Sequence, residues 1–175
     1  MPPYGGGTEP CMENLRKRGF SLQLKPFLLA VIGTLLVGAL SGFLTQNSKE
    51  VYENLILPVF APPASVFGVV WIILYIMMGI ALYFVLISPK SVQRREAVTA
   101  YIFQLIVNFF WSIIFFRFGN FLTAFWWIIL LIILVAVTMY RFKKVNNISF
   151  YLLIPYMVWI LFAAALNLSI YLLNK

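Results

Sequence analysis

Residues 64–88 read ASVFGVVWIILYIMMGIALYFVLIS, a stretch of 25 residues without a single charged side chain. A helix rises 1.5 Å per residue, so about 20 apolar residues cross a hydrocarbon core of about 30 Å. A membrane-spanning strand would alternate apolar and polar residues, whereas this stretch is apolar on all sides. It therefore predicts a membrane-spanning helix. Pro62-Pro63 suits the start of that helix, because proline is tolerated in a first turn.

Four further apolar runs of similar length follow the same pattern, at about 26–45, 97–116, 120–141 and 149–173. Short polar segments containing Asn, Ser, Gly, Lys or Arg separate them. No separate soluble domain or internal repeat is visible. The sequence predicts an all-α membrane protein, a five-transmembrane-helix bundle over residues 26–175.

The composition of the whole chain agrees with a lipid environment. Of its 175 residues 63% are hydrophobic and 10% charged, and the mean hydropathy is +0.95. Soluble domains are about 45–50% apolar and about 25% charged. The net charge of +8 does not indicate nucleic acid, because the charges sit in short clusters between the apolar runs. The expected environment is a lipid bilayer.

Lysine and arginine are unequally divided between the two sides of the predicted bundle. Ten lie in the N-terminal segment and in the loops after the second and fourth helices, and three lie on the opposite side. The positive-inside rule then places the N-terminus inside and the C-terminus outside.

The N-terminal residues 1–25 are polar and are expected to be disordered. Met12 is an alternative start, which would make residues 1–11 vector-derived or dispensable. The following run, from Phe27 to Thr45, is too long for a typical signal-peptide core, so we expect it to be retained as a helix.

Several classes of chemistry are disfavoured by what the chain lacks. It has no histidine and one cysteine, Cys11, so neither a metal cluster nor a histidine-ligated haem is expected. We expect no cofactor and no metal. No charged residue lies in the middle of a predicted helix, which argues against an ion-coupled transporter.

Aromatic and amide side chains recur at helical spacing in three of the predicted helices. They could enclose a flat, mostly apolar ligand, with rings stacking on it and amides fixing its polar edge. The alternative is structural, because Trp and Tyr favour membrane interfaces and Asn and Gln join helices. Likewise Gly38-x-x-x-Gly42 could pack against a neighbouring helix or a second subunit. The three groups are Phe67, Trp71 and Tyr75; Gln104, Asn108 and Ser112; and Trp159, Ala163, Leu166 and Asn167.

Three motifs, in order, resemble one known family. They are Tyr52-x-x-Leu55-x-x-Pro58-x-x-Ala61-Pro62-Pro63-x-x-x-Phe67-x-x-x-Trp71-x-x-Leu74-Tyr75-x-x-x-Gly79, then Gln104-x-x-x-Asn108-x-x-Trp111-Ser112-x-x-Phe115-Phe116, then Leu153-Ile154-Pro155-Tyr156-x-x-Trp159-x-x-Phe162-Ala163-x-x-Leu166-Asn167. This pattern resembles the translocator protein family (TspO/MBR), the tryptophan-rich sensory or peripheral benzodiazepine receptor proteins. The resemblance covers nearly everything from about residue 27 onward.

The resemblance implies a five-helix bundle, often a homodimer, that binds porphyrins such as protoporphyrin IX, isoquinoline carboxamides, benzodiazepines and, in animal members, cholesterol. It implies that Trp71 and Trp159 are paired pocket tryptophans, which some bacterial members use in light-dependent porphyrin breakdown. The ligand-binding residues that it implies are Tyr52, Pro62, Phe67, Trp71, Tyr75, Asn108, Trp111, Trp159, Ala163 and Leu166.

The first loop departs from the family pattern. Val51, Leu57 and Phe60 stand where members often have tryptophan, lysine and tryptophan, so the loop is less aromatic and less basic. Two stretches match a loose cholesterol-recognition pattern, Leu168-x-x-Tyr171-x-x-x-Lys175 and Val137-x-x-Tyr140-x-x-Lys143. These matches carry little information, because such a loose pattern often arises by chance.

These observations favour a membrane receptor or sensor for porphyrin-like ligands that regulates tetrapyrrole metabolism or a stress response. The alternatives are tryptophan-dependent photo-oxidative degradation of a porphyrin, and passive transport of porphyrin- or sterol-like molecules. A bacterial plasma membrane suits the charge pattern, and the mitochondrial outer membrane is the family's other location.

Overall fold

The structure is a computed structural model and describes residues 23–175. Five long helices make up most of this part of the chain. All five are long and apolar enough to cross a membrane, and no strand occurs between residues 23 and 175. This confirms the predicted all-α membrane protein. The helices are α2 (Leu24–Leu44), α4 (Ala64–Ile87), α5 (Val92–Ser112) extended by the π-helical turn η1 (Ile113–Arg117), α6 (Phe121–Val145), and α7 (Asn147–Leu152) followed by α8 (Ile154–Leu173).

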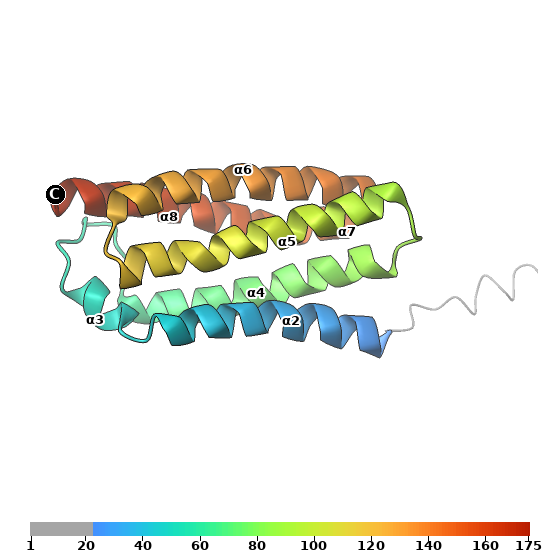
Figure 1. The fold of residues 1–175 in the computed structure, drawn as a ribbon, viewed down its shortest axis with the longest axis horizontal. Coiled ribbons are helices and arrows are strands. Elements are labelled where there is room, and N and C mark those ends of the chain that lie inside the picture. Colours follow the sequence, from blue (N-terminus) through green and yellow to red (C-terminus); the bar gives the residue numbers. More distant parts are fainter. Residues whose placement is uncertain (1–22) are drawn as a thin grey trace, which may run out of the picture.

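The long helices lie lengthwise beside one another (Figure 1). The most extensive contacts join α5 with α6, α2 with α4, and α6 with α8. A short helix, α3 (Ser48–Glu53), lies in the loop between α2 and α4, at the same end of the bundle as the C-terminus (Figure 1). The predicted apolar run 26–45 corresponds to α2, which begins two residues earlier, at Leu24.

Helices α5 and α8 differ in detail from the apolar runs that predicted them. Helix α5 begins at Val92, before the predicted residue 97, because the Ser91 side chain caps it by accepting the Arg94 backbone N–H at 3.1 Å. The predicted fifth helix is divided at Leu153, and α8 then begins with a proline in its first turn. Pro155 has no N–H to continue the hydrogen bonds of α7, so a break there is expected.

Helices α2 and α4 approach each other closely at Gly79. A Cβ atom on Gly79 would lie 2.7 Å from the Cα atom of Val31, so only glycine allows this contact between backbones. In the Gly38-x-x-x-Gly42 motif, by contrast, Gly38 lies against the ring of Tyr75, and a Cβ on Gly42 would meet no atom within 4 Å. Among residues 23–175 the motif therefore does not join two helix backbones.

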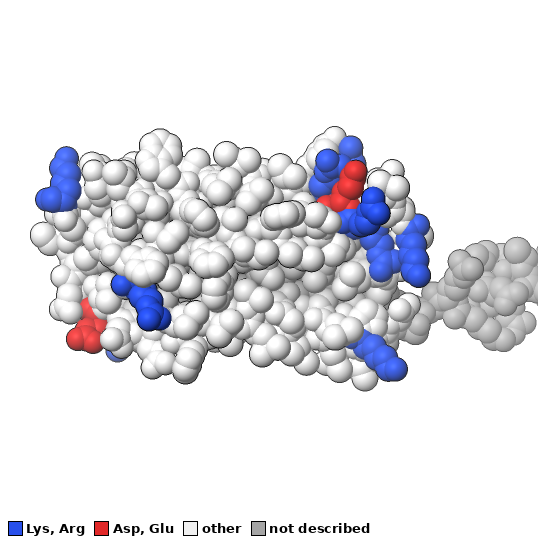
Figure 2. Space-filling model, viewed as in Figure 1, with Lys and Arg blue, Asp and Glu red and all other residues white. Residues whose placement is uncertain are grey.

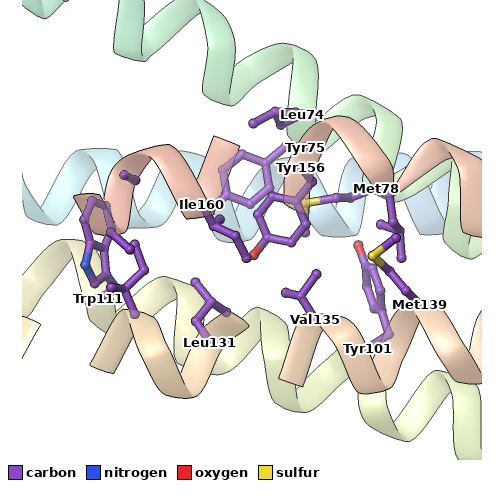
Figure 3. Packing of buried hydrophobic residues seen from close by; sticks show 14 of the residues in the cluster. Leu74, Tyr75, Met78, Tyr101, Trp111, Leu131, Val135, Met139, Tyr156 and Ile160 are labelled. Carbon is purple, nitrogen blue, oxygen red and sulfur yellow. The ribbon is translucent and has the colours of Figure 1, made fainter. Parts of the chain in front are cut away.

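The interior contains a row of large side chains along the bundle axis. Figure 3 shows Trp111 towards one end of this row and Tyr101 towards the other, with Tyr75 and Tyr156 between them. Trp111, Tyr75, Tyr101 and Tyr156 are all buried. Two of these rings, Tyr75 and Trp111, also line the cavity described below.

Charged side chains gather at the two ends of the bundle and leave its middle uncharged on the face shown in Figure 2. Between residues 23 and 175, seven Lys and Arg belong to the end formed by the start of α2 and the α4–α5 and α6–α7 connections, and three belong to the other end. The prediction that the basic end faces inside remains a prediction. The expectations for residues 1–22, including Met12 and Cys11, lie outside the described residues.

Candidate functional site

A cavity of about 570 Å³ lies between α2, α4 and the end of α5 with η1. Phe67, Trp71 and Tyr75 line it from α4, where their spacing of four residues places them on one face of the helix. Trp111 lines it from α5 and Phe116 from η1. These five aromatic side chains together form one wall of the cavity.

The rings of this wall are tilted against one another. The ring centroids of Trp71 and Trp111 are 6.3 Å apart at an interplanar angle of 37°, and those of Trp71 and Tyr75 are 5.7 Å apart at 35°. Asn167 of α8 orients Trp111, because its Oδ1 accepts the indole N–H at 3.4 Å. The Asn167 amide in turn donates to the carbonyl oxygen of Phe121 at 2.8 Å. The aromatic rings are therefore oriented before a ligand binds, and a ring of the ligand could stack on them.

Glycines also line the cavity. Gly38 and Gly42 line the cavity from α2, and Gly68 lines it from α4. A Cβ atom on either Gly42 or Gly68 would meet no atom within 4 Å, and both residues are exposed. Because exposed residues of both helices border it, the cavity opens sideways between α2 and α4, where lipid would surround the bundle.

Hydroxyl groups supply the polar part of the lining. Ser41 of α2, Thr45 directly after α2 and Ser112 of α5 border the cavity, and Ser41 and Thr45 are buried. The Thr45 hydroxyl donates to the backbone oxygen of Ser41 at 2.9 Å. No charged residue is among the residues that line this cavity. The site is suited to a mostly apolar ligand with a few hydrogen-bonding atoms.

Asn108 lies behind the cavity, in a hydrogen-bonded group in the protein interior. Its Nδ2 donates to the Tyr156 hydroxyl at 2.8 Å, and that hydroxyl donates to Gln104 Oε1 at 3.0 Å. Gln104 Nε2 and Asn108 Oδ1 are buried and have no partner among residues 23–175. The predicted stripe Gln104, Asn108, Ser112 thus borders the cavity only at Ser112.

Trp159, Ala163 and Leu166 of α8 do not line this cavity. The Trp159 ring instead makes an edge-to-face contact with Phe67 at 5.7 Å and lies 5.5 Å from Phe162. Ala163 and Leu166 are buried. Phe67, which lines the cavity, therefore connects Trp159 to it, and the second tryptophan of the cavity wall is Trp111.

Tyr52 and Pro62 hold the first loop against α4 and are not part of the cavity lining. The Tyr52 hydroxyl donates to the Pro62 carbonyl oxygen at 3.0 Å, and its ring contacts Phe67 edge to face at 5.1 Å. Burial raises the pKa of Tyr52 above its ordinary value, so the phenol keeps its proton and remains a hydrogen-bond donor. Just after α3, the backbone N–H of Ile56 donates to Asn174 Oδ1, and Asn174 Nδ2 donates to the backbone oxygen of Ile56, both at 2.9 Å.

Comparison with known proteins settles what kind of bundle this is. The sequence model of the TspO/MBR family matches residues 30–173, which includes most of α2 and the other four spanning helices in full. The chain belongs to the TspO/MBR family.

Relatives of this TspO/MBR protein occur in archaea, bacteria and animals. The chain is 36% identical to the tryptophan-rich protein TspO of Archaeoglobus fulgidus, over 87% of this chain and 99% of the relative. It is 37% identical to the tryptophan-rich protein TspO of Chlorobaculum tepidum, over 77% and 85% of the two chains. It is 28% identical to the translocator protein of Sus scrofa, over 85% and 92%.

The contribution of α2 to the cavity of this TspO/MBR protein was not predicted. Helix α2 reads as a uniformly apolar span without aromatic or amide stripes, and its Gly38-x-x-x-Gly42 motif was interpreted only as a packing surface. The available signal was a run of small residues at a spacing of three to four, namely Gly38, Ser41, Gly42 and Thr45. Such residues leave room beside a helix, for either a neighbouring helix or a ligand.

Proposed function

We propose that this TspO/MBR protein is a membrane receptor or sensor that binds flat, mostly apolar ligands of the porphyrin type in the cavity between α2, α4 and α5. The observation that carries this proposal is the wall formed by Trp71 and Trp111, which is held in place by contacts outside the cavity. The volume of about 570 Å³ falls within the range of about 300–1,000 Å³ typical of small-molecule sites.

Two alternative functions each have an observation in their favour. Two indoles that border one cavity favour tryptophan-dependent photo-oxidation of a bound porphyrin, with Trp71 and Trp111 nearest to the ligand. The sideways opening beside Gly42 and Gly68 favours passive exchange of an apolar molecule with the bilayer. The receptor function requires only stable binding, which makes it the simplest of the three.

Titration with protoporphyrin IX tests the receptor proposal. Purified protein in a neutral detergent should show saturable quenching of tryptophan fluorescence in the dark, because the ligand would lie against Trp71 and Trp111. Trp71→Phe should remove a large part of this quenching. Trp126→Phe should remove little, since Trp126 is 64% exposed on the outside of the bundle.

The same titration under illumination separates sensing from photochemistry. A porphyrin spectrum that persists in the light supports stable binding and sensing. Loss of that spectrum in the light, in the wild type but not in Trp71→Phe, would favour photo-oxidation. Absence of saturable quenching in the dark would contradict the receptor proposal itself.

We further propose that the basic end of the bundle faces the cytoplasm of a bacterial plasma membrane, with the mitochondrial outer membrane as the alternative. The excess of Lys and Arg at that end supports this orientation. Assembly as a homodimer is also proposed, on the resemblance to the family alone.

A further inference from the structure

A second hollow adjoins the aromatic cavity at the end of the bundle that carries α3. Its volume is about 510 Å³, and it lies between the end of α2, the start of α3 and the end of η1. Thr45, Ser48 and Phe116 line both hollows. The two hollows therefore adjoin each other at these three residues, and we call the second hollow the mouth.

The lining of the mouth differs in chemistry from the lining of the cavity. Gln46 and Asn47 contribute amides, and Arg117 contributes a guanidinium group at the end of η1. In the part of the chain that the structure describes, no acidic residue lines either hollow. The site as a whole is thus amphipathic, with an apolar aromatic interior and a polar, positively charged mouth.

Arg117 is available to a ligand. Its guanidinium group makes no ion pair and no hydrogen bond with any other residue between 23 and 175. The nearby cation Lys49, by contrast, lies 3.9 Å from Glu53. A cation at a helix C-terminus is also favoured by the helix dipole, and arginine is common at membrane boundaries. Those effects explain an arginine at the end of η1, but not its place in the wall of a hollow that adjoins the aromatic cavity.

We propose that the two hollows form one site for a flat aromatic ligand that carries a carboxylate, with its rings in the aromatic cavity and its carboxylate on Arg117. A guanidinium group presents a planar fork of donors that matches a carboxylate in two parallel hydrogen bonds. Phe116 and Ser48, which border both hollows, mark where the ligand passes from one to the other. This inference rests on the proposed function, because it assumes that the cavity binds a flat ligand.

The test compares protoporphyrin IX, which has two carboxylates, with its neutral dimethyl ester. Both are titrated in a neutral detergent, so that charged headgroups do not compete. We expect the wild type to bind the diacid about tenfold more tightly than the diester at low salt, and added salt to reduce this difference. Arg117→Gln should lower the affinity for the diacid about tenfold and leave that for the diester unchanged.

Two further variants serve as controls. Lys175→Gln removes a positive charge from the same end of the bundle without touching either hollow, and should preserve the preference for the diacid. Arg117→Lys keeps the charge but loses the planar fork, and should retain part of the preference. Because Arg117 is exposed, its substitution should leave the melting temperature unchanged.

The outcomes separate this inference from the function on which it rests. If Arg117→Gln keeps the preference for the diacid, or weakens both porphyrins equally, the role of Arg117 is wrong and the receptor proposal stands. If the wild type binds both porphyrins with equal affinity, the role of Arg117 is again wrong. If the wild type binds neither, both proposals fail.

Discussion

Gly42→Phe is expected to weaken protoporphyrin IX binding by about 100-fold or more without unfolding the protein. Gly42 lines the cavity, and a Cβ atom there would meet nothing within 4 Å, so the new side chain has space to enter. Side chains on a helix lean towards its N-terminus, which would carry the new ring over Gly38, another part of the cavity wall. A benzyl group in that volume would overlap the space that a flat ligand needs. A 100-fold loss corresponds to about 2.7 kcal/mol of binding free energy.

Gly33→Phe is the matched control. Gly33 is also an exposed glycine of α2 beside which a Cβ would meet nothing, but it does not line the cavity. Both variants replace glycine in a helix, which by itself favours the helix by a few tenths of a kcal/mol. Binding by equilibrium titration and melting temperature should be measured on both. Wild-type affinity in Gly42→Phe would mean that the ligand binds elsewhere.

Tyr156→Phe is expected to cause the largest loss of stability, about 2–4 kcal/mol in the free energy of unfolding in detergent. The change removes one hydroxyl and with it two hydrogen bonds, from Asn108 Nδ2 and to Gln104 Oε1. Gln104 and Asn108 already have one unpartnered atom each. The variant would leave both amides without any partner among the described residues, and buried polar groups without partners are costly.

Tyr151→Phe provides the comparison for this effect. Tyr151 lies on α7 and is 64% exposed, so loss of its hydroxyl should change stability by less than about 0.5 kcal/mol. Both variants should be followed by thermal or denaturant unfolding, monitored by circular dichroism. Equal, small losses in the two variants would show that the amides of Gln104 and Asn108 readily find other partners.

Much of the fold could be predicted because a bilayer imposes a length on every span. Apolar runs at 64–88 and 120–141 therefore correspond closely to α4 and α6. The sequence did not reveal α3, since six residues are too few to show helical periodicity. Nor did it reveal the π-helical turn η1 at the end of α5, because a single such turn has no periodicity of its own in the sequence.

The candidate site was predictable in part, for a different physical reason. The spacing of Phe67, Trp71 and Tyr75 places them on one face of α4, and all three do line the cavity. Spacing cannot tell how far a neighbouring helix is rotated about its axis, because that follows from packing. Trp159 accordingly lies against Phe67 and Phe162, outside the cavity, although its motif gave no reason to separate it from Trp71.

The position of a bound porphyrin tests the central claim most directly. We would determine the structure of the protein with protoporphyrin IX, in lipid or detergent, at a resolution that shows the ring. The account predicts the macrocycle between α2 and α4, against the rings of Trp71 and Trp111. A macrocycle seated on Trp159 and Ala163 of α8, or on the outer surface beside Trp126, would contradict it.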